Sequence, residues 1–283
     1  MASEILRQLR HPLFDELEQQ WQPYLAAAGN VQPATQMLAQ VPGLQSASVG
    51  IQDGGRIPYV ASARETALSV APSIFGKACE AAAGALSSSD NGKWLSGVSS
   101  FYLACYFMAR AILYIFGLAP LARDSKITID LFPSSEDKAP DRPYSNELQV
   151  WTTGRWEHDL VWKLLGRVLT TLKAERELRD EYSDFRRIHW DSVSMRRNRY
   201  SYSDEFICWN NEAIFSSIPS DALCDIRTLS VGVDFRRHTE EAGFYFALFK
   251  ILFSFHEKSV RAAKANLYYS PYCDDTRRDA VAA

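Results

Sequence analysis

The segment MRRNRYSYSDEF, residues 195–206, gathers the side chains of this chain that are best suited to hold an anion. Its candidates are Arg196, Arg197, Asn198, Arg199, Tyr200 and Tyr202. Guanidinium groups match pairs of phosphate oxygens with a planar fork of donors, and tyrosine rings stack on bases. This composition indicates a site for phosphate or RNA, whereas a solvated helix face paired with Asp184 and Asp191 is the plainer interpretation.

The spacing of histidines and cysteines predicts no local metal motif. The histidines are His11, His158, His189, His238 and His256. None of them forms HxH, HExxH or HxxxH, and the five cysteines include no CxxC pair. Glycine-rich nucleotide-binding motifs are also absent from the sequence. We therefore expect neither a metal nor another cofactor, and only His189 keeps catalytic interest, because it lies about two helical turns before Arg197.

Charge balance and cysteine usage limit the partners and the compartment. The formal net charge of -3 is nearly neutral, so any contact with nucleic acid depends on a local patch. An odd number of cysteines without paired spacing does not resemble a disulfide framework, and we expect a reducing cytoplasm. The charged N-terminal residues lack the apolar core of a signal peptide.

The most apolar stretch, residues 94–122, carries Arg110 near its middle. A central arginine is unfavourable in lipid, whereas a helix buried in a soluble bundle explains the same composition, so we expect no membrane contact. The guanidinium needs a partner inside such a bundle. Either a carboxylate on a neighbouring helix pairs with Arg110, or Arg110 points into a cleft beside Arg197.

Hydrophobic periodicity predicts the elements that would position these residues. Helices are expected over residues 3–21, 63–86, 94–117 and 239–269, and two more within 157–200. In the first helix, Leu17 and Trp21 share the apolar face with Leu13 and Phe14. Glu157 and His158 are best explained as a helix start, where acidic residues are favoured.

A strand pattern interrupts the helices. Over residues 125–132, apolar side chains alternate with Thr128 and Asp130, which we expect on the opposite face of the strand, and residues 147–153 form the returning strand. The fold class is therefore mainly α, a helical bundle with a small β-hairpin insertion. The expected divisions are an N-terminal helix and irregular segment at 1–63, the bundle at 64–267 with its hairpin near 126–152, and a tail at 268–283.

Two segments together resemble the HEPN-domain superfamily. SSFYLACYFMARAILYIFG, residues 99–117, is similar to the second helix of those domains. The matching residues are Ser100, Tyr102, Ala109, Arg110, Ala111, Leu113 and Gly117. RNRYSY, residues 197–202, resembles the family motif of an arginine, a polar residue and a later histidine, and follows the helix by about 85 residues. The resemblance covers roughly residues 65–260.

HEPN domains are helical bundles that commonly dimerise, and their paired arginine–histidine motifs cleave RNA without a metal. The resemblance implies catalytic roles for Arg197, Asn198 and Tyr202. It implies RNA-binding roles for Arg196, Arg199, Tyr200 and Arg110. It also implies that the protein forms a homodimer or binds a partner protein. The implied biological role is that of a toxin or an antiviral-defence component. In such a site arginine stabilises the charge that grows on the phosphorane.

The sequence departs from the family motif at one position. Tyr202 stands where a histidine is expected, and tyrosine has a pKa of roughly 10 against roughly 6.5 for histidine. His189 is a substitute only if the fold turns it into the same cleft. An RNA-binding or RNA-cleaving protein and an inactive scaffold subunit therefore both stay open. The apolar segment 243–255 favours the scaffold if it covers an interface instead of its own core.

Overall fold

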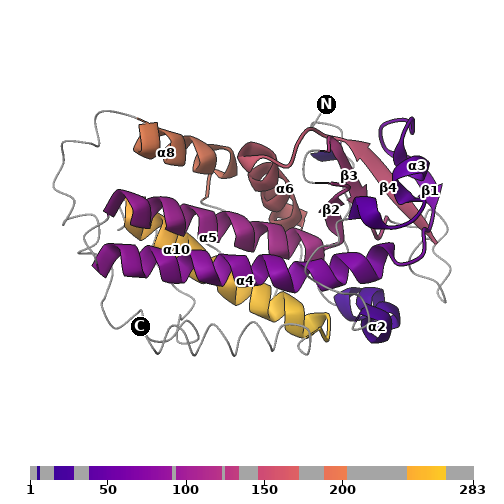
Figure 1. Cartoon of the computed structure of the whole chain (residues 1–283), viewed down its shortest axis with the longest axis horizontal. Helices are drawn as coiled ribbons and strands as arrows, with labels where there is room; N and C mark the ends of the chain where they lie inside the picture. The colour runs from indigo at the N-terminus through magenta and orange to yellow at the C-terminus, as the bar shows by residue number, and fades with distance from the viewer. Residues whose placement is uncertain are drawn as a thin grey trace.

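The computed structural model describes residues 5–6, 16–28, 38–90, 94–122, 125–133, 146–171, 188–202 and 241–265. The predicted architecture, a helical bundle with a small β element, is confirmed (Figure 1). Helices α4 (Ala63–Asp90), α5 (Trp94–Ile115) and α10 (Glu241–Ala262) lie side by side as the body of the bundle. Helices α6 (His158–Thr171) and α8 (Trp190–Tyr202) cover α5 from the other side.

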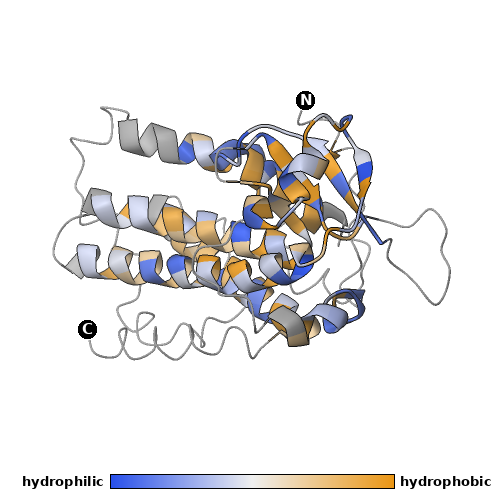
Figure 2. Cartoon of the chain, turned by 45° about the vertical axis from the view of Figure 1, so that its right-hand side comes forward, coloured by the Kyte–Doolittle hydropathy of each residue, from blue (hydrophilic) through white to orange (hydrophobic). Residues whose placement is uncertain are grey.

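Helix α5 is the core helix of the bundle. Its segment Ser96–Ile115 is long and apolar enough to span a membrane, but 72% of the most apolar window is buried by the surrounding elements. Apolar side chains on nearly every side are what a helix needs when neighbours surround it. The colouring in Figure 2 places apolar residues where the helices face one another and where they meet the sheet.

The predicted hairpin is confirmed as part of a larger sheet. Its strands β3 (Ile127–Asp130) and β4 (Glu147–Thr152) pair antiparallel, with Ile129 opposite Val150. Two strands that the sequence did not reveal complete the sheet, β1 (Gly55–Pro58) beside β4 and β2 (Leu118–Pro120) beside β3. The strand order is β1-β4-β3-β2, all antiparallel.

Thr128 and Asp130, the polar residues of this alternation, are both buried. Trp156, which follows β4, donates its indole N–H to Thr128 Oγ1 at 2.8 Å. Asp130 Oδ1 accepts the backbone N–H of Phe132 at 3.0 Å. These bonds satisfy the polar groups, so both faces of β3 can be covered.

The N-terminal part shares one hydrophobic core with the bundle. Its elements are α2 (Leu17–Ala28), the short 3-10 turn η2 (Leu38–Gln40) and α3 (Leu44–Ser48). Leu17 and Trp21 are fully buried, as predicted, and Trp21 Nε1 donates to the carbonyl of Ile115 at 2.7 Å. Leu13 and Phe14, the rest of that predicted face, lie outside the described residues.

Helix α6 buries an apolar face formed by Leu160, Trp162, Leu164, Leu165 and Val168. The apolar segment of α10 also packs inward. Its buried side chains include Tyr245, Leu248, Phe249, Ile251, Leu252 and Phe255. The core of this chain therefore uses most of the apolar surface of α10, and that surface no longer calls for an external partner.

Candidate functional site

The first half of α8 is held firmly by its neighbours. Trp190 stacks on Trp162 of α6, with ring centroids 6.1 Å apart and an interplanar angle of 21°. Ser194 donates a hydrogen bond to Asp159 in the first turn of α6. Tyr245 of α10 donates its hydroxyl to the carbonyl of Val193 at 3.2 Å. Contacts from two helices therefore fix the direction in which α8 continues.

The predicted site residues occupy the second half of this helix. We call residues 196–202 the α8 arginine segment. Its backbone is helical to Tyr202, and Arg196 places its guanidinium carbon 4.1 Å from the ring centroid of Phe244. The side chains of Arg197, Asn198, Arg199, Tyr200 and Tyr202 lie outside the described part of the structure.

The helix itself offers no acidic neighbour to Arg197 or Arg199. Side chains three or four residues apart are adjacent on a helix, and those positions hold valine, serine, methionine, arginine and tyrosine. Asp191, the acidic residue in the first turn of α8, is six positions before Arg197. Asp184, the other partner considered, lies outside the described residues. Asp191 therefore does not lie within three or four residues of Arg197 or Arg199.

Arg110, the remaining predicted site residue, has tyrosine neighbours on its own helix. Burial raises the pKa of Tyr106 and of Tyr114, and the nearby guanidinium of Arg110 opposes that rise. The guanidinium carbon lies 5.8 Å from the centroid of the Tyr106 ring. Within the described residues no ion pair joins Arg110 to a carboxylate, so the expected carboxylate partner is not seen.

The structure does not bring Arg110 together with Arg196. Arg196 lies against Phe244, and Phe246, two residues later on that helix, contacts Phe101 with centroids 5.7 Å apart. Arg110 follows Phe101 by nine residues along α5, a rise of about 14 Å. Any role of Arg110 in anion binding therefore belongs to a different part of the bundle.

His189, the considered substitute for the motif histidine, is exposed and precedes the first residue of α8. Its carbonyl accepts hydrogen bonds from the backbone N–H (2.8 Å) and the hydroxyl (2.7 Å) of Ser192. This places His189 at the opposite end of the helix from Tyr202. Eight residues, or about 12 Å of rise, separate it from Arg197.

Sequence reasoning missed a network around His158, which begins α6 as predicted. The hydroxyl of Tyr102 lies 2.7 Å from His158 Nδ1, and Trp162 Nε1 donates to that hydroxyl at 3.3 Å. Tyr102 belongs to the segment that resembles HEPN domains, but nothing in the sequence indicated that a histidine 56 residues later would meet it.

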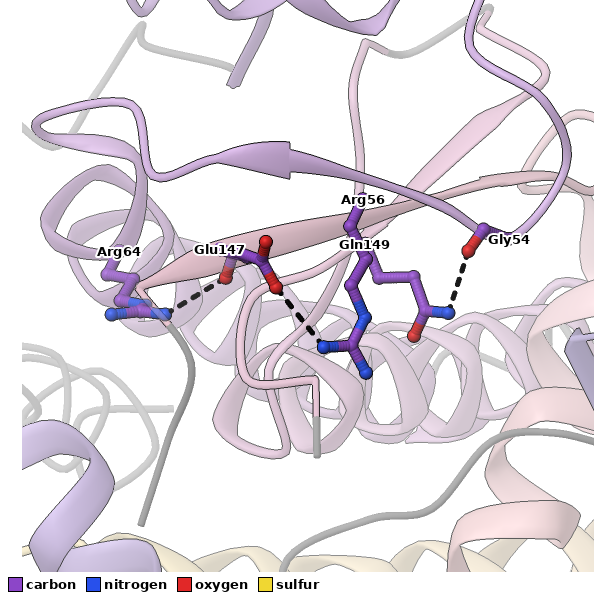
Figure 3. Close-up of polar contacts among 5 residues, drawn as sticks. All are labelled: Gly54, Arg56, Arg64, Glu147 and Gln149. Carbon is purple, nitrogen blue, oxygen red and sulfur yellow. Dashed lines mark hydrogen bonds and ion pairs between the residues drawn. The ribbon is translucent and has the colours of Figure 1, made fainter. Parts of the chain in front are cut away.

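A second polar cluster, around Arg64, is structural (Figure 3). Arg64 is buried and donates to the carbonyls of Leu131 (2.8 Å) and Glu147 (3.3 Å) and to the Tyr24 hydroxyl. Arg56 pairs with the Glu147 carboxylate at 3.1 Å. These bonds tie α2, α4 and the sheet together, and protein groups already surround the Arg64 guanidinium.

Among the residues that the structure describes, no group of three or more histidine, cysteine or acidic side chains is placed to hold a metal ion. Compared with protein-family models, curated proteins and solved structures, the chain matches none. The candidate site must therefore be judged by its own chemistry.

Proposed function

We propose that this protein binds RNA through the α8 arginine segment. The observation that carries the proposal is the placement of arginines on the second half of a helix whose first half is fixed by α6 and α10. A rigid element reduces the ordering entropy that binding requires. The charged guanidinium groups of such a segment suit phosphate oxygens.

RNA suits this segment better than a small anion. The segment combines arginines with Tyr200 and Tyr202, and single-stranded RNA is recognised by phosphate contacts together with stacking of bases on aromatic rings. Metal-independent cleavage, which the HEPN resemblance implies, also needs a group that moves protons near neutral pH. Tyrosine at position 202 is poorly suited to that step, so binding is the proposed function.

A scaffold role has less support. The apolar segment that motivated it is part of α10 and packs mostly into the core of this chain. Among the described residues, the exposed large apolar side chains are Val49, Leu103 and Met195, which lie on separate elements. Cys79 and Cys105 are buried free thiols, which supports a cytoplasmic location as part of the proposal.

Fluorescence anisotropy with a labelled 20-nucleotide single-stranded RNA, in EDTA, tests the proposal. We expect Arg197→Ala to weaken binding about tenfold. Arg261→Ala is the matched control, because Arg261 is an exposed arginine paired with Glu257 near the far end of α10. Equal affinities for all three proteins would refute the assignment. Gel analysis of the same mixtures tests for cleavage.

A further inference from the structure

Arg110 lies among aromatic side chains in the second half of α5. Its guanidinium carbon is 5.8 Å from the ring centroid of Tyr106, and its buried Nε has no hydrogen-bond partner among the residues that the structure describes. Tyr114, one turn further along α5, meets Trp156 edge to face with centroids 6.1 Å apart. Arg110 therefore lies where α5 packs against the connection from β4 to α6.

The neighbouring tyrosines supply no counter-charge to this arginine. Burial raises the pKa of Tyr106 and of Tyr114 above the ordinary value, so both phenols are neutral at pH 7. The Tyr106 hydroxyl donates its proton to the carbonyl of Trp156 at 2.8 Å. Its oxygen can then accept a hydrogen bond from the guanidinium, but it cannot neutralise the positive charge.

An acidic residue of the same surface also lacks an ion pair. Besides burial, which raises the pKa of Tyr106 most, the guanidinium of Arg110 lowers this pKa and the carboxylate of Glu157 raises it. Both charges therefore lie near one hydroxyl. Within the described part of the chain, neither Arg110 nor Glu157 takes part in an ion pair, although Glu157 is exposed and Arg110 is partly exposed.

Apolar side chains continue this surface along α5. Phe107 and Leu103 precede Arg110 by three and seven residues, which places all three on one face of the helix. Leu103 is 37% exposed and Phe107 is partly exposed, although most of α5 is buried. Arginine and aromatic side chains are enriched among the residues that carry the binding energy of protein interfaces. We call Leu103, Phe107, Arg110 and Glu157 the α5 patch.

We propose that the α5 patch is the interface of a homodimer, in which Arg110 of each copy pairs with Glu157 of the partner subunit. A two-fold axis brings the same patch of two copies together, so that every contact occurs twice. A patch that carries both signs of charge is complementary to itself under this symmetry, and the same contact covers the exposed apolar side chains. The inference goes beyond the proposed function and does not rest on RNA binding.

Sedimentation velocity over a range of protein concentrations tests this interface. We expect wild type to dimerise, and Arg110→Glu and Glu157→Arg each to raise the dimer Kd about a hundredfold, because each substitution places like charges opposite one another at both pairs. Arg261→Glu is the control, since Arg261 is exposed on α10 and lies outside the α5 patch, and it should keep the wild-type Kd.

Mixing the two single variants distinguishes a contact between copies from a contact within one copy. When an Arg110→Glu copy meets a Glu157→Arg copy across the two-fold axis, opposite charges face each other at both pairs. We therefore expect the equimolar mixture to dimerise with a Kd within about tenfold of wild type, although neither variant does so alone. Thermal unfolding verifies that each variant is folded, and Glu157→Arg, which changes an exposed side chain, tests the interface by itself.

Three results would overturn this inference. They are a wild-type protein that stays monomeric at every concentration, a folded Glu157→Arg variant that dimerises as well as wild type, and folded single variants whose equimolar mixture stays monomeric. A dimer that shows the expected charge dependence but binds no RNA would support the α5 interface and remove only the proposed function.

Discussion

At the residue scale, two buried titratable groups of this fold respond to pH in opposite directions. Burial raises the pKa of Asp130 to about 7, against the opposing effects of the Phe132 N–H and two arginines. Burial lowers the pKa of His256 to about 3, and its ring stacks on Phe75 with centroids 4.6 Å apart. Both groups favour their neutral forms because water is excluded from them.

Relative to wild type, Asp130→Asn should lose stability when the pH is lowered from 7 to 5. Because the folded pKa of Asp130 lies above its unfolded value of roughly 3.9, the folded state binds the proton, and stability is lost as pH rises towards 7 and beyond. Ionisation of Asp130 should cost the wild-type protein about 2 kcal/mol of unfolding free energy between pH 5 and pH 7, and Asp130→Asn should not show this loss. Urea unfolding at both pH values measures it, and an unchanged difference between them would contradict the buried, neutral carboxyl.

His256→Phe should have the opposite effect. The folded pKa of about 3 lies below the unfolded value of roughly 6.5, so this histidine contributes stability that is lost as pH falls through that window. Phenylalanine keeps an aromatic ring against Phe75 and removes the titration. Relative to wild type, the variant should gain about 2 kcal/mol on going from pH 7 to pH 5. A relative loss on acidification would show that His256 is accessible to protons in the native state.

At the element scale, the position of α8 depends on close approach to α6 at Gly166. A Cβ there would lie 2.6 Å from Trp190 Cδ1 and 2.7 Å from its Cγ. We expect Gly166→Ala to destabilise the protein by about 1–3 kcal/mol and to weaken RNA binding, because Trp190 must move and carry α8 with it. Chemical denaturation and anisotropy measure the two effects.

Gly84→Ala is the matched control for this substitution. Gly84 also lies inside a helix, α4, but a Cβ there meets no atom within 4 Å. Alanine should stabilise that helix by about 0.5–1 kcal/mol and leave RNA affinity unchanged. If both variants were equally destabilised, the explanation through Trp190 would be wrong.

The same scale shows what the sequence could and could not predict. Helices α4, α5, α6 and α10 were predictable because their apolar periodicity is local. Strand β1 was not, because Gly55–Pro58 gains its strand character from pairing with Glu147–Val150, about 90 residues away. The contact of His158 with Tyr102 was hidden for the same reason, whereas the arginine segment was visible as a run of residue types.

At the scale of the whole molecule, the nearly neutral net charge of -3 gives no general attraction to nucleic acid. Affinity for RNA must therefore come from a few phosphate contacts at one place. The slope of log affinity against log salt is proportional to the number of those contacts. The bundle supports this local arrangement, since α5, α6 and α10 hold the first half of α8 and leave its second half to carry the arginines.

The salt dependence of RNA affinity tests the central claim most directly. Anisotropy titrations from low to moderate salt give the slope of log Kd against log salt for wild type, Arg197→Ala/Arg199→Ala and the control Arg261→Ala. We predict that the slope of the double variant is smaller in magnitude than the wild-type slope by about 1.4, because each phosphate contact removed lowers it by about 0.7. The control should keep the wild-type slope. Identical slopes and affinities for all three proteins would contradict an RNA site on α8.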